Sequence, residues 1–194
     1  PNKNCPIHQR QIGEHSLSFA NALRARLRED PNVILVGEMR DNETISLALT
    51  AAEVGLLVLG TLHTKSASQT ISRVIDAFPV DQQPQIRLAL SEILVGVCSQ
   101  QLLRRAEGGG RTAALEIMVR NHAIANLIRE SKTHQITNSI VMGRKEGMQL
   151  MDDHLKQLVS AKVVTAEEAA RYSENPQAIL AHGRSVGASP QIAA

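Results

Sequence analysis

The sequence predicts an α/β protein with a parallel sheet, flanking helices and a helical C-terminal region. Two apolar runs, at 33–37 and 56–62, are continuous rather than alternating, as in strands buried on both faces. A helical segment at 41–53 separates them, and Gly55 follows that segment as a stop signal. Strand, helix and strand within about 30 residues predict a βαβ unit with parallel strands. From Asn121 onward the apolar spacing is helical.

The flanking elements follow from periodicity and capping residues. A helix is expected at 15–29, with Ser16 or Ser18 as its N-cap. Apolar residues at helical spacing predict two more helices, at 66–77 and 81–101.

A turn and a series of helices complete the chain. The three glycines at 108–110 predict a hairpin turn between strands at 100–104 and 111–119. The helices expected beyond that hairpin span 121–131, 133–142, 147–161 and 166–173.

These elements suggest a core domain followed by an appendage. We expect an α/β core over 1–119, a helical region over 120–174, and a tail over 175–194 that is rich in small residues and lacks fixed structure. The chain opens with PNKNCPIHQR, which has no initiator methionine and no signal-peptide core, so we expect it to be a piece of a longer protein.

The composition limits the classes of function. Hydrophobic residues make up 43% and aromatic residues 2%, so we expect an aliphatic core and no ring platform for stacking bases. Lys and Arg total 21 against 19 Asp and Glu, which gives no broad basic face for nucleic acid. Cys5 and Cys98 form no CxxC pair, as expected in the reducing cytoplasm. No apolar stretch reaches the ~20 residues of a membrane span, so direct membrane insertion is not expected.

Polar side chains follow both strands of the βαβ unit. They are Glu38, Arg40 and Asp41 after the first strand, and Thr61, His63 and Thr64 after the second. Because open parallel sheets bind ligands outside the carboxyl ends of their strands, these residues predict a site. An apolar strand followed by an acid is the Walker-B pattern, whose carboxylate contacts Mg²⁺, directly or through water, or orients the water that attacks a γ-phosphate. A histidine beside it can sense that phosphate or donate to its developing charge.

Structural alternatives exist for several of these residues. Asp41 has the position of an N-cap for the next helix. Arg24, Arg28 and Arg40 suit contacts with a γ-phosphate, across a subunit boundary in some motors. The alternative for Arg24 and Arg28 is a charged helix face paired with the acids at 29–30, and Arg40 can pair with Asp41 or with the acid at position 43.

Longer segments of the sequence resemble a known family. LREDPNVILVGEMRDNET at 27–44 resembles the Walker-B region of bacterial type II and type IV secretion ATPases, and GTLHT at 60–64 resembles the core of their His box. The similarity spans roughly 5–172 and includes 73–79, 109–118 and 123–130. AIANLIRE at 123–130 resembles the AIRNLIRE motif of the type IV pilus retraction ATPases, and 102–111 contains no cysteine of the zinc module common in the related extension and secretion ATPases.

This resemblance implies a RecA-like P-loop NTPase fold and a hexameric motor that hydrolyses ATP with Mg²⁺. It implies that Glu38 positions the attacking water and holds Mg²⁺ through water, that His63 senses the γ-phosphate, and that Arg40 supports the site. Nucleotide contacts are expected from Arg24, Arg28 and Thr64.

The implied motor works in the cytoplasm, peripherally attached to the inner-membrane pilus machine. Its partners would be further copies of itself and a pilus platform protein of that membrane. The segment that would couple the motor to that partner consists of Ala123, Ile124, Asn126, Leu127, Ile128, Arg129 and Glu130.

The sequence also departs from the family pattern. No G-x-x-x-x-G-K-[ST] phosphate-binding loop occurs among its 12 glycines, so we expect a partial ATPase core that is inactive alone. Leu56 stands where the His box has its first histidine, and Ala125 stands where AIRNLIRE has arginine. Two alternatives are a non-catalytic fragment that binds motor subunits or platform proteins, and a type II secretion or pilus-extension ATPase without its zinc module.

Overall fold

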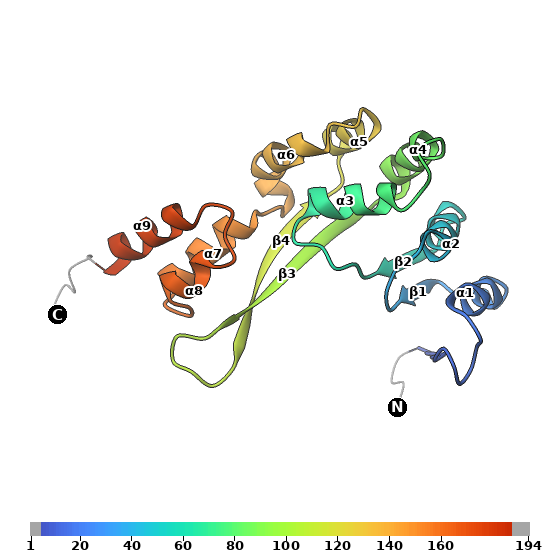
Figure 1. Cartoon of the computed structure of the whole chain (residues 1–194), viewed down its shortest axis with the longest axis horizontal. Helices are drawn as coiled ribbons and strands as arrows, with labels where there is room; N and C mark the ends of the chain where they lie inside the picture. Colours follow the sequence, from blue (N-terminus) through green and yellow to red (C-terminus); the bar gives the residue numbers. More distant parts are fainter. Residues whose placement is uncertain (1–4, 188–194) are drawn as a thin grey trace. The chain divides into compact units, whose positions relative to one another are not determined.

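A computed structural model of the chain describes residues 5–187 (Figure 1). Two compact units are present, one built from Pro1–His63 and Asp76–Ile93, the other from Thr64–Ile75 and Leu94–Ala194. The elements in chain order are α1 (Phe19–Leu27), β1 (Val33–Val36), α2 (Asn42–Glu53), β2 (Leu57–Gly60), α3 (Ala67–Asp76), α4 (Gln83–Ile93), β3 (Gly96–Arg104), β4 (Arg111–Val119), α5 (His122–Arg129), α6 (Ile136–Met142), α7 (Met151–Ser160), α8 (Ala166–Ala170) and α9 (Pro176–Gly187), with 3-10 turns at Thr133–Gln135 and Gly143–Glu146.

The first unit contains the predicted βαβ arrangement. β1 and β2 pair in parallel, from Val33 opposite Leu57 to Val36 opposite Gly60, with α2 between them in the chain. This confirms the two parallel strands, but the expectation that both of their faces are buried is wrong, because alternate side chains of both strands are exposed. The preceding helix, α1, begins later than expected, because the hydroxyl oxygen of Ser18 accepts the N–H of Asn21 at 3.1 Å and caps it there.

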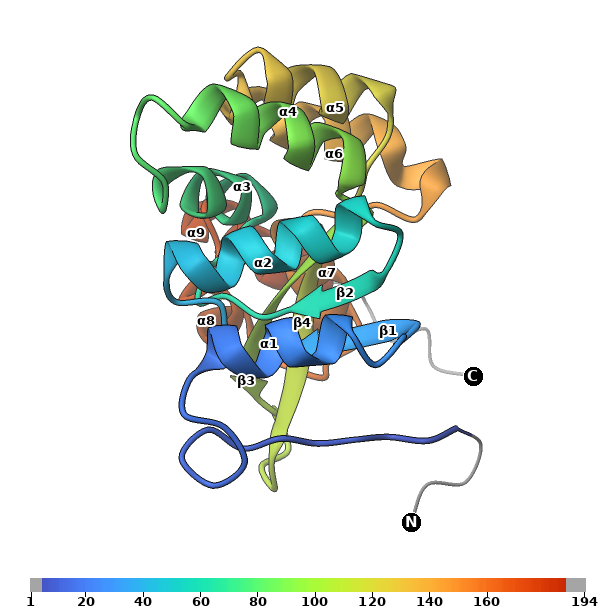
Figure 2. The same ribbon diagram turned by 90° about the vertical axis from the view of Figure 1, so that its right-hand side faces the viewer.

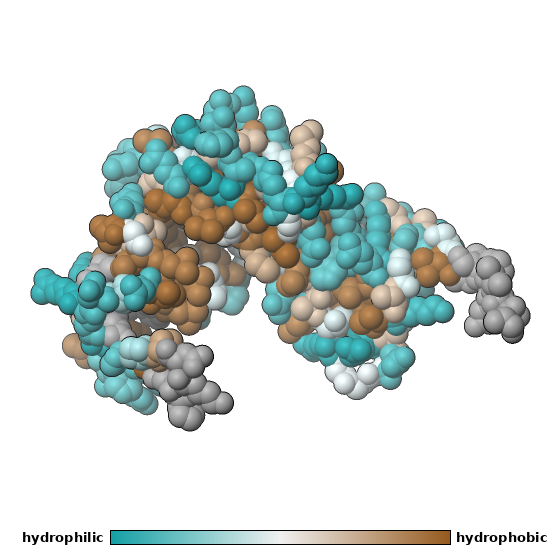
Figure 3. All heavy atoms as spheres, turned by 180° about the vertical axis from the view of Figure 1, so that it is seen from behind, coloured by the Kyte–Doolittle hydropathy of each residue, from teal (hydrophilic) through white to brown (hydrophobic). Residues whose placement is uncertain are grey.

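One face of the β1–β2 pair carries the core of this unit. Leu23 of α1 and Ala51 of α2 pack with Ile34 and Val36 of β1, all buried, and Figure 2 shows both helices beside the strands. The side chains that alternate with them are exposed apolar groups, namely Val33, Leu35, Leu57 and Leu59. Figure 3 shows brown apolar surface over this part of the molecule. A parallel sheet is normally covered on both faces. In this pair, one face is packed against α1 and α2, and the apolar side chains of the other face are exposed.

The second unit contains an antiparallel hairpin. β3 and β4 pair along their full lengths, from Gly96 opposite Val119 to Arg104 opposite Arg111, and the predicted glycine turn joins them. The expected helix over 81–101 is wrong beyond Ile93, because 96–101 belongs to β3. The backbone of that stretch bonds across to β4, and the cross-strand ladder outweighs the helical spacing of its apolar residues.

Helices of the C-terminal region pack against this hairpin. Leu155 of α7 and Ile179 of α9 are fully buried in a cluster with Leu103 of β3 and Ala114 of β4. The expectation of a tail without structure is therefore wrong for Pro176–Gly187, which form α9; residues 188–194 lie outside the described part of the chain. β3 and β4 belong to the same compact unit as the helices that follow them. The predicted boundary between an α/β core and a helical region, at 119–120, stays a prediction.

Candidate functional site

The parallel pairing of β1 and β2 brings their carboxyl ends to one edge. Beyond the paired residues, the N–H of Met39 donates to the carbonyl of Thr61 at 3.0 Å, and the Thr61 hydroxyl donates to the carbonyl of Gly37. The sequence places Thr61 among the polar residues that predict the site, and its individual role, which the sequence does not indicate, is to bond the two strand ends together. These bonds fix the segments on which Glu38 and His63 lie.

Glu38 is the centre of a three-residue cluster at this edge. Its Oε1 lies 2.9 Å from Nε2 of His63, and its Oε2 lies 2.5 Å from Nη2 of Arg40. The Glu38 side chain is 25% exposed, whereas that of His63 is 86% exposed. The structure thus unites three of the predicted site residues. The alternative in which Arg40 pairs with Asp41 or Glu43 is wrong, because its ion pair is with Glu38.

Electrostatics keeps the Glu38 carboxylate ionised. The hydrogen bond from Arg40 has the largest effect and lowers the pKa of Glu38. Burial, the next largest effect, raises it, and the charges of Arg40 and His63 lower it again. The pKa of Arg40 is raised in return, chiefly by its hydrogen bond with Glu38. An anion held in this way can orient a water molecule or attract a cation.

The described residues offer Mg²⁺ no complete set of ligands. No group of three or more His, Cys, Asp or Glu side chains within 5–187 is arranged to hold a metal. Mg²⁺ typically keeps several waters and takes only one or two carboxylates alongside phosphate oxygens. A single carboxylate such as Glu38, acting through water, fits that mode of binding.

Three other predicted residues, Asp41, Arg24 and Thr64, have structural partners. Asp41 is the N-cap of α2, which is the structural alternative given for it above, since its carboxylate accepts the N–H of Thr44 at 2.8 Å. Arg24 pairs with Glu43 at 2.8 Å, rather than with the acids at 29–30. Arg28 is exposed just past α1. In the second unit, the Thr64 hydroxyl lies 2.6 Å from that of Thr70.

The predicted coupling segment forms α5 in the second unit. Asn121 caps this helix through a bond from the N–H of Ile124 at 3.1 Å. Its buried side chains are Ile124, Ala125 and Ile128, and Leu127 is half-buried. The exposed residues of the segment are Ala123, Asn126, Arg129 and Glu130, so the expected polar face is present. Ala123 was expected on the apolar face but is exposed, and Ala125 is buried on the apolar face in its place.

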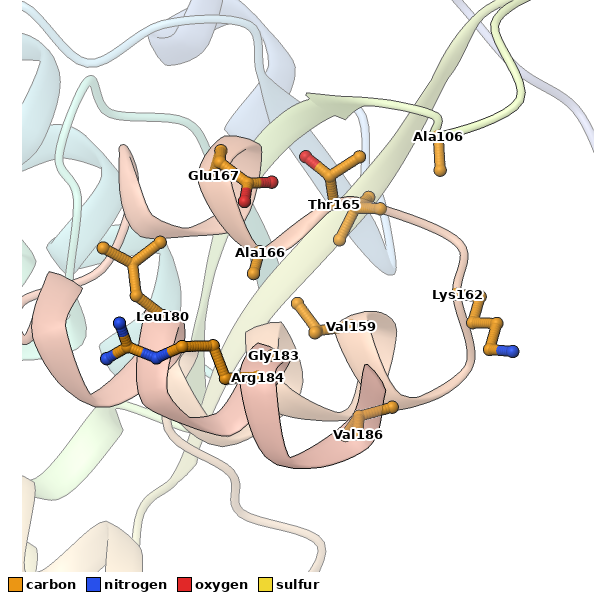
Figure 4. A pocket seen from close by; sticks show the side chains of 11 residues that line it. Ala106, Val159, Lys162, Thr165, Ala166, Glu167, Leu180, Gly183, Arg184 and Val186 are labelled. Atoms are coloured by element: carbon orange, nitrogen blue, oxygen red, sulfur yellow. The ribbon is translucent and has the colours of Figure 1, made fainter. Parts of the chain in front are cut away.

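A hollow in the second unit lies apart from all predicted site residues. Its volume is about 370 Å³, and Val159, Thr165, Gly183 and Arg184 are among the residues of α7 to α9 and the α7–α8 connection that line it (Figure 4). Across the described range 5–187, no helix combines the length and hydrophobicity that crossing a membrane requires.

Comparison with known proteins identifies the family. The model of the type II/IV secretion system protein family matches residues 4–190, and the chain belongs to that family. It is 50% identical over 177 residues to the twitching motility protein of Neisseria gonorrhoeae, covering 91% of this chain and 47% of that protein. It is 51% identical over 175 residues to the type IV pilus retraction ATPase PilT of Pseudomonas aeruginosa, covering 90% of this chain and 51% of PilT.

A solved structure supports the same grouping. The crystal structure of the pilus retraction motor PilT with bound ADP matches with a TM-score of 0.80 at 50% identity, covering 88% of this chain and 48% of that one. The chain therefore spans about half the length of the relatives that it matches. Its mixed α/β fold corresponds to a part of the retraction ATPase.

The lowered pKa of Glu38 yields a test of the cluster. Because Arg40 has the largest lowering effect, Arg40→Ala should move the titration of Glu38 to higher pH, toward its ordinary value of 4.5. NMR of the side-chain carboxyl carbons measures this shift. The matched control is Arg24→Ala, which removes an exposed ion pair to Glu43 instead. An unchanged Glu38 titration in Arg40→Ala would contradict the assigned cause.

Proposed function

We propose that this chain is the C-terminal part of an ATP-hydrolysing motor that drives retraction of type IV pili. The observation that carries the proposal is the Glu38 cluster, in which an ionised carboxylate at the edge of a parallel pair lies 2.9 Å from His63. Membership of the secretion ATPase family and the identity with PilT over most of this chain support it. The complete motor would have a RecA-like fold and use Mg²⁺ and ATP in the cytoplasm.

In this proposal Glu38 prepares the attacking water. Its carboxylate accepts a hydrogen bond from water and holds it in line with the γ-phosphate, which lowers the barrier by orientation and proton acceptance. Mg²⁺, when bound, would neutralise developing charge on the phosphate oxygens. In the described structure both carboxylate oxygens contact neighbours, so Glu38 exchanges one contact for water when the nucleotide binds.

His63 and Arg40 complete the cluster in this proposal. His63 is mostly exposed and bonds Glu38, so it can turn from the carboxylate toward a phosphate oxygen and report whether the γ-phosphate is present. Arg40 keeps Glu38 ionised and supports the site. Arg24 and Arg28 would reach a nucleotide across a subunit boundary only after Arg24 leaves Glu43, and Thr64 would contribute from the segment after His63.

The work of the motor would depend on assembly. Six copies would form a ring attached peripherally to the inner-membrane pilus machine, and α5 would present its polar face to the platform protein. The support for α5 is its resemblance to the retraction motif together with the exposure of Arg129 and Glu130. The two alternatives are a non-catalytic interaction fragment, which the activity of the isolated chain and of a complete protein distinguishes from a motor, and a type II secretion or extension ATPase.

Replacement of Glu38 tests the catalytic role. In the complete protein, Glu38→Gln should bind ATP but lose roughly 10²- to 10⁴-fold in kcat, because the near-isosteric amide cannot accept the proton of the attacking water. Steady-state ATPase assays and a binding titration measure the two effects. Glu53→Gln, at an exposed position of α2, should match the wild type. A normal kcat in Glu38→Gln would move the role to another carboxylate.

An ATPase assay of the isolated 194-residue chain, compared with a complete protein, distinguishes a motor from an interaction fragment. It should release no phosphate from ATP above background, because backbone amides and the lysine of a phosphate-binding loop are needed to hold the nucleotide. Turnover by the pure chain would contradict this expectation. If a complete protein containing this chain also lacks both the loop and the activity, the interaction fragment becomes the better interpretation.

Replacement of the exposed charges of α5 tests coupling. In the complete protein, the double variant Arg129→Ala and Glu130→Ala should keep ATPase activity and ring assembly but lose twitching, because neither side chain is needed for the helix to pack. The control pair is Arg105→Ala with Glu107→Ala, two opposite exposed charges near the hairpin turn. Parallel loss of ATPase and twitching, or no change in either, would exclude a coupling role; normal twitching would be expected of the control.

A further inference from the structure

Glu116 is a buried acid that the proposed chemistry does not use. It lies on β4 between the buried residues Ala114 and Met118, and only 7% of its surface is exposed. Buried carboxylates are costly unless their oxygens accept hydrogen bonds. The donors that satisfy Glu116 come from two different helices.

The first donor is the amide at the start of α3. The N–H of Ala67, the first residue of that helix, donates to Oε1 of Glu116 at 2.8 Å. The second donor is the backbone amide of Met151, the first residue of α7, whose hydrogen bond is among the effects that lower the pKa of Glu116. α7 has no side-chain cap of its own, since Leu150 precedes it. Glu116 therefore satisfies N-terminal amides of both helices, and its charge complements both dipoles. Figure 1 shows both helices starting beside β4.

The segment around Glu116 is bound tightly to the start of α7. Ile117 exchanges two backbone hydrogen bonds with Gln149, at 2.9 and 3.0 Å, and the N–H of Leu115 donates to Nδ1 of His154 at 2.9 Å. By contrast, among the hydrogen bonds described between α3 and β4, the connection is the single bond from Ala67 to Glu116. α7 is thus hydrogen-bonded to β4 at several points. α3 is packed through its buried apolar side chains, and its described hydrogen bond to β4 depends on the Glu116 side chain.

A second polar side chain faces Glu116 across the hairpin. Ser99 of β3 is directly opposite Glu116 in the ladder, and directly opposite residues share a face with Cβ atoms about 5 Å apart. Ser99 is 4% exposed, and its hydroxyl has no hydrogen-bond partner among the described residues. A buried hydroxyl in this position is free to donate to the carboxylate.

We propose that Glu116 is a latch that holds α3 to β4 and α7, and that Ser99 is the alternative donor when α3 leaves. In the closed arrangement the carboxylate bonds the amides of Ala67 and Met151. In the open arrangement it keeps Met151 and exchanges Ala67 for the Ser99 hydroxyl, so that no buried acceptor loses its partner. Glu116 acts here as a positioning residue, through α3.

The charge environment is consistent with a release mechanism. Burial raises the pKa of Glu116, and the carboxylates of Asp152 and Glu174 raise it further, whereas the bonds from Ala67 and Met151 lower it. Burial is the dominant effect, so two amides do not fully compensate the carboxylate for leaving water. A third donor within reach therefore makes opening at α3 less costly than a simple loss of one bond.

The latch matters to the motor because of where α3 lies in the sequence. Ala67 follows the His63–Thr64 segment of the candidate site after only two intervening residues, Lys65 and Ser66. A displacement of that segment on nucleotide binding would move the start of α3. Whether this movement is transmitted to α7 would depend on the hydrogen bond between Glu116 and Ala67. This consequence rests on the proposed function, whereas the latch itself does not.

Amide hydrogen exchange in the 194-residue chain, without nucleotide, tests the latch. In Glu116→Gln the uncharged oxygen is a weaker acceptor and the NH₂ group cannot accept, so the amide of Ala67 or that of Met151 should exchange about 10-fold or more faster. In Ser99→Ala the open arrangement loses its donor, so Ala67 should exchange severalfold more slowly while Met151 is unchanged. The control Glu167→Gln, an exposed acid of α8, should leave both amides unchanged.

Specific results would overturn the proposal. Unchanged exchange at both amides in Glu116→Gln would show that the carboxylate fastens neither helix. Unchanged or faster exchange of Ala67 in Ser99→Ala would show that Ser99 is not the alternative donor, as expected if ordered water serves the hydroxyl instead. If Glu116→Gln fails to fold, the Ser99→Ala result alone decides, because removal of an unpartnered hydroxyl leaves the core volume nearly unchanged.

A measurement in the complete motor separates the latch from the assignment of function. Glu116→Gln should leave the KM for ATP unchanged and reduce twitching. Normal twitching in that variant would overturn the role in transmission. If the complete wild-type protein hydrolyses no ATP, the proposed function fails, and the exchange results still decide whether the latch exists.

Discussion

The parallel pairing of β1 and β2 is the constraint on which the candidate site depends. Glu38 and His63 are separated by 25 positions in the chain, and only the in-register pairing of two short strands brings their carboxyl ends to one edge. α2 makes that pairing possible, because a parallel connection needs a crossover long enough to return the chain. Asp41 caps the crossover helix directly after the site. The short segment from Glu38 to Asp41 therefore supplies both the carboxylate of the site and the N-cap of α2.

The chain uses its carboxylates in two contrasting environments. Glu38 is at the surface, with a cation and a histidine on its two oxygens, and its pKa is lowered. Glu116 is buried, with backbone amides as partners, and its pKa is raised. The first environment leaves an ionised group that can exchange partners with water or ligand at little cost. The second holds secondary structure together, and any exchange of partners must occur inside the protein.

Local patterns predicted most of the elements, because they depend on residues close in the sequence. The apolar runs of β1 and β2, the cap at Asp41 and the glycine turn of the hairpin are of this kind. The failures are tertiary. The stretch 96–101 has helical spacing but becomes a strand because β4 is available to pair with it. Pro176–Gly187 reads as a tail of small residues, yet Ile179 finds a buried position against α7.

The site divides in the same way. Parallel strands necessarily place Glu38 and His63 together, so the topology alone predicted the cluster. Partners of long charged side chains could not be predicted, since Arg24 reaches Glu43 on another helix and Arg40 turns back to Glu38. Glu116 was within reach of sequence reasoning, because alternation along 111–119 places it on the same face as Ala114 and Met118. The helices that satisfy it come from distant parts of the chain, and no local pattern indicates them.

The departure at Ala125 bears on which residues of α5 can carry coupling. This position is fully buried, against the apolar side of the helix. An arginine at this position would need space in the packed interior for its long side chain and a partner there for its charge. Alanine needs neither. The substitution therefore changes the packed face of α5 and leaves Arg129 and Glu130 exposed on the other. If α5 couples the motor to a partner, the recognising charges are those at the end of the helix, and Ala125 affects them only through the way that the helix is seated.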